Sequence, residues 1–132
     1  MRRIMVPAAA LAASAMLAAV AGCTGGGTAG DARISATDRK EAHEIFQARC
    51  ATCHGQFGRG DGPGAVALNP KPQNYADAAW QAKVTDAEIE KAIVYGGASV
   101  GKSPQMVPNP DLEVKPGVVA ALREKVRSFG EQ

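Results

Sequence analysis

The stretch Cys50-Ala51-Thr52-Cys53-His54 is the part of this sequence that decides the fold. Two cysteines separated by two residues and followed directly by a histidine form the pattern that attaches c-type haem. The two thiols can add across the two vinyl groups of a haem, and the adjacent imidazole then projects toward the iron on one face. We therefore predict that Cys50 and Cys53 bind one haem c covalently and that His54 is an axial ligand of its iron.

Three other interpretations of this pattern are weaker. A thioredoxin-like dithiol centre needs strands around it, and no segment of the sequence alternates apolar and polar residues over strand length. A zinc site needs more cysteine or histidine ligands, and only Cys23 and His43 remain for that role. The cysteine count of 3 is odd, which argues against a plain disulfide framework.

Residues 1–22 form a separate unit at the start of the chain. Arg2 and Arg3 precede an uncharged, mostly apolar run over residues 4–20, which is the pattern of a secretory signal that is removed from the mature protein. Without these two arginines the 15 basic residues of the chain fall to 13, equal to its 13 acidic residues. A mature protein without net charge gives no support for a nucleic-acid partner or for a polybasic membrane surface.

The signal ends in small residues before Cys23, and this resembles the signal of bacterial lipoproteins, which is cleaved just before a cysteine that receives a diacylglycerol. An ordinary cleavage site that happens to precede a cysteine is the alternative. Residues 24–30 are small and glycine-rich, so residues 23–36 are predicted to be a lipidated cysteine and a flexible tether. We expect an exported lipoprotein that is anchored in a lipid bilayer through Cys23 and faces the periplasm or the cell exterior.

The mature part is short and poor in large side chains. Removal of 22 of the 132 residues leaves 110, with one Trp, two Tyr and three Phe, which is a thin core for a self-sufficient domain. A bound cofactor is therefore expected to fill it. The domain over residues 37–132 is predicted to be all-α. Capping residues and the spacing of apolar side chains predict helices over residues 36–50, 85–95 and 116–129, with loops over residues 55–74 and 101–110.

Over roughly residues 37–129 the chain resembles the class I cytochrome c family. The likeness lies in the run from Cys50 to Gly55 and in the runs Gly58-Arg59-Gly60-Asp61-Gly62-Pro63 and Leu68-Asn69-Pro70-Lys71-Pro72. It implies a small fold in which a few helices wrap round one covalently attached haem and the first and last helices cross. The residues that match this crossing are Phe46 and Ala42 on the first helix and Leu122 and Val126 on the last.

The second axial position is assigned to Met106, the one methionine outside the signal. Met106 lies between Pro104 and Pro108, and this loop is similar to the Met-Pro ligand loop of the family, with Val107 as a departure from the pattern. One alternative is His43, which sits on the attachment side of the fold and reaches the opposite haem face with difficulty. The other alternative is a sixth position that is open or weakly bound.

The resemblance also implies roles for residues around the haem. In this family a proline carbonyl accepts the second ring N–H of the axial histidine, and Pro63 and Pro70 both qualify. Trp80 occupies roughly the place of a tryptophan that bonds a haem propionate, with ordinary core packing as the alternative. Arg59, Lys71 and Lys102 are expected either to form a docking patch at the exposed haem edge or to be ordinary solvated surface residues.

Together these patterns predict a membrane-anchored one-electron carrier that exchanges electrons with redox partner proteins, such as a membrane complex, a reductase or an oxidase. We expect no enzyme, because the sequence contains no nucleophile–base pair, paired carboxylates or phosphate-binding loop. The alternative is a haem enzyme or a gas or redox sensor with a labile sixth ligand, which would need a distal acid–base residue. The tether also allows a role as the haem-binding subunit of a larger complex.

Overall fold

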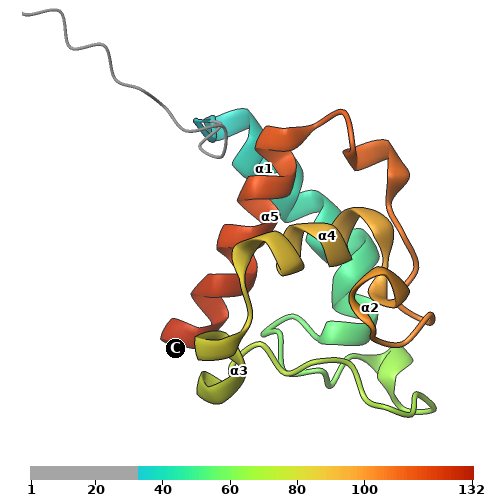
Figure 1. The fold of residues 1–132 in the computed structure, drawn as a ribbon. Coiled ribbons are helices and arrows are strands. Elements are labelled where there is room, and N and C mark those ends of the chain that lie inside the picture. Colours follow the sequence, from blue (N-terminus) through green and yellow to red (C-terminus); the bar gives the residue numbers. More distant parts are fainter. Residues whose placement is uncertain (1–32) are drawn as a thin grey trace, which may run out of the picture.

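The computed structural model of the protein describes residues 33–132 (Figure 1). The expected signal segment, the lipidation site Cys23 and the tether up to residue 32 lie outside the described residues. The described part is helical and none of its residues is in a strand, so the predicted all-α class is confirmed. No helix among residues 33–132 combines the length and the apolar character that a bilayer crossing needs.

The elements follow one another in a simple order. The helices are α1 (Ala36–Ile45), a π-helix (Phe46–Cys50), α2 (Ala51–His54), α3 (Ala78–Lys83), α4 (Asp86–Tyr95) and α5 (Pro116–Ser128). Short 3-10 turns cover Pro63–Ala65, Gly97–Val100, Pro110–Leu112 and Phe129–Glu131. Apart from these turns, the predicted loops over residues 55–74 and 101–110 are irregular.

The first helical run begins with a capping box. The Ser35 hydroxyl accepts the N–H of Asp38, and the Asp38 carboxylate accepts the N–H of Ser35 in return. The run then passes through α1, the π-helix and α2 without a break, so the predicted first helix extends to His54. Gly55 ends it with a φ of 77°, a left-handed value that glycine adopts without strain.

The π-helix changes the register of this run. The Ala51 N–H reaches the carbonyl of Phe46, five residues back rather than four. One extra residue in a turn rotates the residues after it by one helical step, about 100°. The buried stripe of the run therefore continues from Phe46 to Ala51, and Cys50 lies beside this stripe.

The helices α4 and α5 begin and end where the sequence predicts. Thr85 and Glu88 form a capping box at the start of α4, and Gly96 ends it with a φ of 78°. Pro116 occupies the first turn of α5, where a missing N–H breaks no helical hydrogen bond. At Phe129 the last helix passes into a 3-10 turn. The predicted helices over residues 85–95 and 116–129 are therefore confirmed.

The short helix α3 was not predicted. The carboxylate of Asp77 caps it by accepting the N–H groups of Ala79 and Trp80 at 2.9 and 3.2 Å. Six residues are too few to show a helical period in the sequence. The capping residue Asp77 is therefore the one local signal of this helix.

Arg127 joins α5 to the junction between α3 and α4. Its guanidinium donates to the carbonyls of Gln81 and Val84, each at 2.8 Å, and pairs with the Asp86 carboxylate at 2.7 Å. Carbonyls at a helix end have no partner within the helix. Arg127 thus satisfies the end of α3 and ties it to the last helix.

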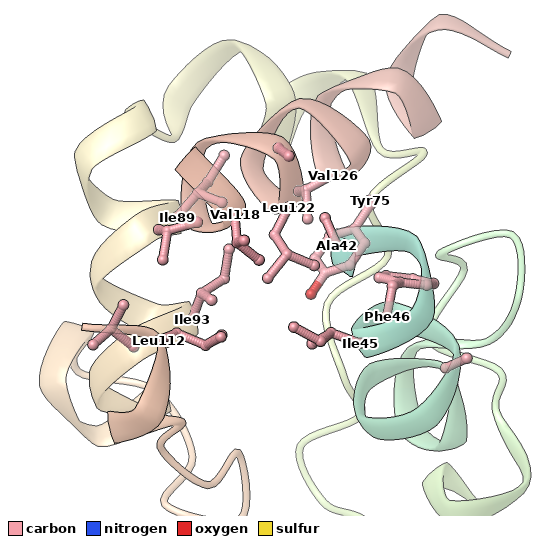
Figure 2. Close-up of a cluster of buried hydrophobic side chains, with 14 of the residues drawn as sticks. Ala42, Ile45, Phe46, Tyr75, Ile89, Ile93, Leu112, Val118, Leu122 and Val126 are labelled. Carbon is pink, nitrogen blue, oxygen red and sulfur yellow. The ribbon is translucent and has the colours of Figure 1, made fainter. Parts of the chain in front are cut away.

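The core lies where α1 and α4 pack against α5 (Figure 2). Phe46 is 1% exposed, and its ring packs against the ring of Phe129 with 5.4 Å between centroids. Ala42, Leu122 and Val126 belong to the same buried cluster. The predicted crossing of the first and last helices is confirmed, and Phe129 is the aromatic partner of Phe46.

Replacement of Phe46 by Ala should lower the free energy of unfolding of the haem-loaded protein by about 3–5 kcal/mol, because a fully buried ring leaves a cavity at the helix crossing. Chemical denaturation measures this loss. Phe57, which is 61% exposed, provides the control, and its replacement by Ala should change the unfolding free energy by less than about 0.5 kcal/mol. Equal losses in the two variants would contradict the assignment of Phe46 to the core.

Candidate functional site

The two thiols of the motif lie one helical turn apart. Cys50 is the last residue of the π-helix and Cys53 lies in α2. Both are free and partly buried, and burial raises the pKa of the Cys50 thiol to about 11. Side chains three residues apart in a helix are neighbours on one face. The two sulfurs therefore occupy adjacent positions on the same side of this run.

His54 is buried at the end of α2, where it is 8% exposed. Its Nδ1 lies 3.2 Å from the Gln73 carbonyl oxygen. A carbonyl can only accept, so Nδ1 carries the proton and donates it. Burial lowers the pKa of His54 more than this hydrogen bond raises it, which favours the neutral ring. The other ring nitrogen, Nε2, therefore carries a lone pair that can accept a hydrogen bond or bind a metal.

The hydroxyl of Tyr75 lies 3.0 Å from Nε2 of His54, and the two rings stack with 4.5 Å between centroids and 13° between planes. Because Nε2 is unprotonated, the hydroxyl is the donor in this contact. Burial raises the pKa of Tyr75, so the phenol keeps its proton. Tyr75 was not singled out in the sequence, where an isolated tyrosine has no spacing signal.

A glycine-rich loop folds back over the end of α2. The N–H groups of Gly60 and Gly62 donate to the carbonyls of His54 and Cys53 at 2.8 and 3.2 Å. A Cβ on Gly62 would lie 2.3 Å from the Thr52 carbonyl oxygen, which no side chain tolerates. The missing side chains allow this close approach, and the loop then delivers residues 73–75 to the imidazole.

The predicted acceptor for His54 is wrong. Neither Pro63 nor Pro70 accepts the ring N–H, because Pro63 begins a 3-10 turn and the loop returns to the imidazole only after Pro72. The acceptor is the carbonyl of Gln73. Every residue offers a carbonyl, so no signal in the sequence identifies this one.

Met106 lies on the loop that follows α4, and its side chain is partly buried. Its N–H donates to the Ser103 carbonyl at 3.2 Å, and its carbonyl accepts the N–H of Gly97 at 2.9 Å. A Cβ on Gly96 would lie 2.7 Å from the Met106 carbonyl oxygen. The two glycines that end α4 therefore let this loop pack directly onto the helix.

The structure brings Cys50, Cys53 and His54 together on one turn, whereas Met106 lies on a separate segment. The group within hydrogen-bond reach of Nε2 is the Tyr75 hydroxyl. His43 is exposed on α1, as expected for a surface residue. Among residues 33–132, no three His, Cys, Asp or Glu side chains are grouped as metal ligands.

Trp80 packs against the Tyr75 ring with 5.4 Å between centroids. This contact agrees with the alternative of ordinary core packing for Trp80.

The three basic residues expected near the haem edge differ in their surroundings. Lys71 donates to two backbone carbonyls of the loop at 2.8 Å each, Arg59 lies over the ring of Phe57 at 6.0 Å, and Lys102 is exposed. Lys71 therefore holds the loop together.

The donor set of this turn fits a covalently attached haem. Two free thiols on one helix face can form two thioethers, and a neutral imidazole with its Nδ1–H already bonded presents Nε2 as a metal ligand. A metal bound at Nε2 would replace the hydrogen bond that the Tyr75 hydroxyl donates there.

A helical domain with this donor set defines a c-type haem protein. The sequence model of the cytochrome c family matches residues 40–122. The chain therefore belongs to the cytochrome c family, as a class I member, and its cofactor is covalently bound haem c. No individual curated protein matches the chain.

Replacement of Gly62 by Ala should lower the free energy of unfolding by about 1–3 kcal/mol, because the new Cβ forces the loop off the backbone of α2. Gly64 is the matched control in the same loop, since a Cβ there would meet its nearest atoms at 3.1 Å rather than 2.3 Å. Gly64→Ala should therefore have the smaller effect. Denaturation of both haem-loaded variants tests this order, and the reverse order would contradict the close approach at Gly62.

Proposed function

We propose that this protein is a membrane-anchored one-electron carrier, with His54 and Met106 as the axial ligands of a haem held by the two motif cysteines. The observation that supports this best is the buried, neutral imidazole of His54, whose Nδ1–H is bonded to Gln73 and whose Nε2 keeps its lone pair. When bound, the haem supplies the one-electron change between ferric and ferrous iron. Cytochrome c domains are typically electron carriers rather than enzymes.

The residues around His54 prepare it for this role. The hydrogen bond to Gln73 fixes the plane of the imidazole and increases its strength as a ligand. Tyr75 stacks on the ring and keeps the surroundings of the imidazole largely free of water, because both side chains are 8% exposed. A site of low dielectric favours the less charged ferrous state and so raises the reduction potential.

Several features support Met106 as the second axial ligand. It is the sole methionine of the described residues, and its side chain is partly buried on a loop whose backbone is fastened to Gly97 and Ser103. A thioether ligand opposite a histidine raises the potential further. His43 is disfavoured because it is exposed on α1. Two axial ligands in both redox states keep small molecules from the iron, as a carrier requires.

The membrane anchor and the partners are inferred from the sequence and the family. The signal-like residues 1–22, followed by Cys23 and a glycine-rich segment, support export and lipidation. The protein then faces the periplasm or the cell exterior. Membership of the cytochrome c family supports redox proteins as partners, and a membrane complex, a reductase or an oxidase would each suit an anchored carrier.

Met106→Ala tests the proposed ligation. The haem should stay attached, because both cysteines and His54 are unchanged, while the iron becomes open to carbon monoxide and cyanide and the potential falls. The free energy of unfolding should decrease by about 2 kcal/mol or more, since a partly buried side chain and a metal bond are lost. Visible and near-infrared spectra, a redox titration and denaturation measure these changes.

Val107→Ala is the control for this variant, because Val107 is 66% exposed beside Met106 and should leave the spectra unchanged. If the unmodified protein already binds carbon monoxide readily and Met106→Ala alters neither spectrum nor potential, the sixth position is open. In that case a haem enzyme or a gas sensor becomes the better interpretation.

Cys23→Ser tests the anchor. The wild-type chain, produced by a host that processes lipoproteins, should partition into detergent. The variant should be soluble or keep its signal, because serine cannot form the thioether to the diacylglycerol. Mass spectrometry of the mature N-terminus gives the modification directly. An unmodified cysteine after Gly22 would contradict lipidation and leave the haem assignments untouched.

A further inference from the structure

Arg49 connects the two segments that bear the proposed axial ligands. Its Nη1 lies 2.9 and 3.0 Å from the two carboxylate oxygens of Asp111 and 3.3 Å from Oδ1 of Asn109. Arg49 directly precedes the first haem cysteine, and its two partners follow Met106 by three and five residues. Within the described part of the chain, Arg49 makes every hydrogen bond between residues 46–54 and residues 96–113.

The far end of this connection is itself fixed to α4. The backbone N–H of Asn109 donates to the Val94 carbonyl at 2.9 Å, and its side-chain amide donates to the Ile93 carbonyl at 2.8 Å. The next turn is secured by Leu112, which is 0% exposed. Asn109 therefore presents its amide oxygen to Arg49 from a position that is fixed to α4. The contact with Arg49 thus also restrains the loop that carries Met106, three residues earlier in the chain.

We propose that Arg49 is a positioning residue that holds the Met106 loop at the correct distance from the haem-binding turn. This inference rests on the proposed His/Met ligation. With haem bound, the two thioethers and His54 would tie the iron to the helical run that contains Arg49, whereas Met106 belongs to the loop after α4. The separation of the two segments would then set how closely Met106 approaches the iron, and the contact of Arg49 with Asp111 limits that separation.

The expected magnitude follows from the exposure of this ion pair. The side chains of Arg49 and Asp111 are 44% and 50% exposed, and exposed pairs typically contribute about 0.2–1 kcal/mol. The upper value corresponds to about a fivefold change in an equilibrium constant. Such a change is small in global unfolding but measurable when an external ligand competes with Met106 for the iron.

Lys115 and Glu41 provide a matched control pair. Their ion pair spans 2.6 Å, their side chains are 43% and 36% exposed, and the pair also joins the first helical run to a distant segment. It links α1 to the start of α5 and does not touch the loop of Met106. An effect that is merely structural should be the same for both pairs.

The experiment compares Arg49→Gln, Arg49→Lys, Asp111→Asn, the double variant Arg49→Gln/Asp111→Asn and Lys115→Gln in the full haem-loaded protein. Three quantities are measured: the near-infrared band of thioether–iron bonding, the affinity of the ferric protein for cyanide, and the reduction potential. Arg49→Gln and Asp111→Asn should each increase the cyanide affinity by up to about fivefold, weaken the band and lower the potential. The double variant should add little, Arg49→Lys should restore part of the loss, and Lys115→Gln should change none of the three quantities.

The inference is overturned if Arg49→Gln changes the denaturation midpoint as Lys115→Gln does and leaves band, cyanide affinity and potential unchanged. A thioether band in the unmodified protein, together with unresponsive Arg49 variants, would remove this inference and leave His/Met ligation standing. Absence of the band from the unmodified protein would overturn both.

Discussion

The hydrogen bond from Nδ1 of His54 to the Gln73 carbonyl determines how the loop after α2 has to fold around the haem-binding turn. A buried polar group without a partner costs about 1–3 kcal/mol, so the chain has to bring an acceptor to the imidazole. The loop after α2 does this by lying directly on the last helical turn, which the small size of Gly60 and Gly62 permits. The same hydrogen bond places the ring proton on Nδ1, and this leaves the lone pair that can bind a metal on Nε2.

The first helical run has to serve two purposes with one chain segment. Its N-terminal part packs Phe46 against the ring of Phe129, and its C-terminal part has to carry two thiols and an imidazole, with Cys50 only partly buried at the edge of the same core. The π-helix resolves this conflict, because the one-residue change of register continues the buried stripe through Ala51 and leaves Cys50 beside it. Irregular turns of this kind are frequent at functional sites.

Local signals explain which features could be predicted. The capping box at Thr85, the proline at residue 116 and the consecutive residues of the haem motif each specify their structure or chemistry within a few positions. The fold class and the turn that binds the cofactor followed from them. Gln73 and Tyr75 reach His54 only through the return of a long loop, and the π-helix lies between the helix crossing and the haem motif. Such features are properties of the tertiary structure, so no short stretch of sequence predicts them.

The unbroken helical run from Ala36 to His54 separates its two ends by a large part of the domain. At a rise of 1.5 Å per residue its two ends lie roughly 28 Å apart. The chain enters the described part at Arg33, next to the first turn of α1, whereas the haem motif lies at the end of α2 (Figure 1). The first turn of α1 and the haem motif thus lie at the two ends of this helical run. A protein that contacts the end with the haem motif leaves the first turn of α1 accessible, so contacts at the two ends do not compete for space.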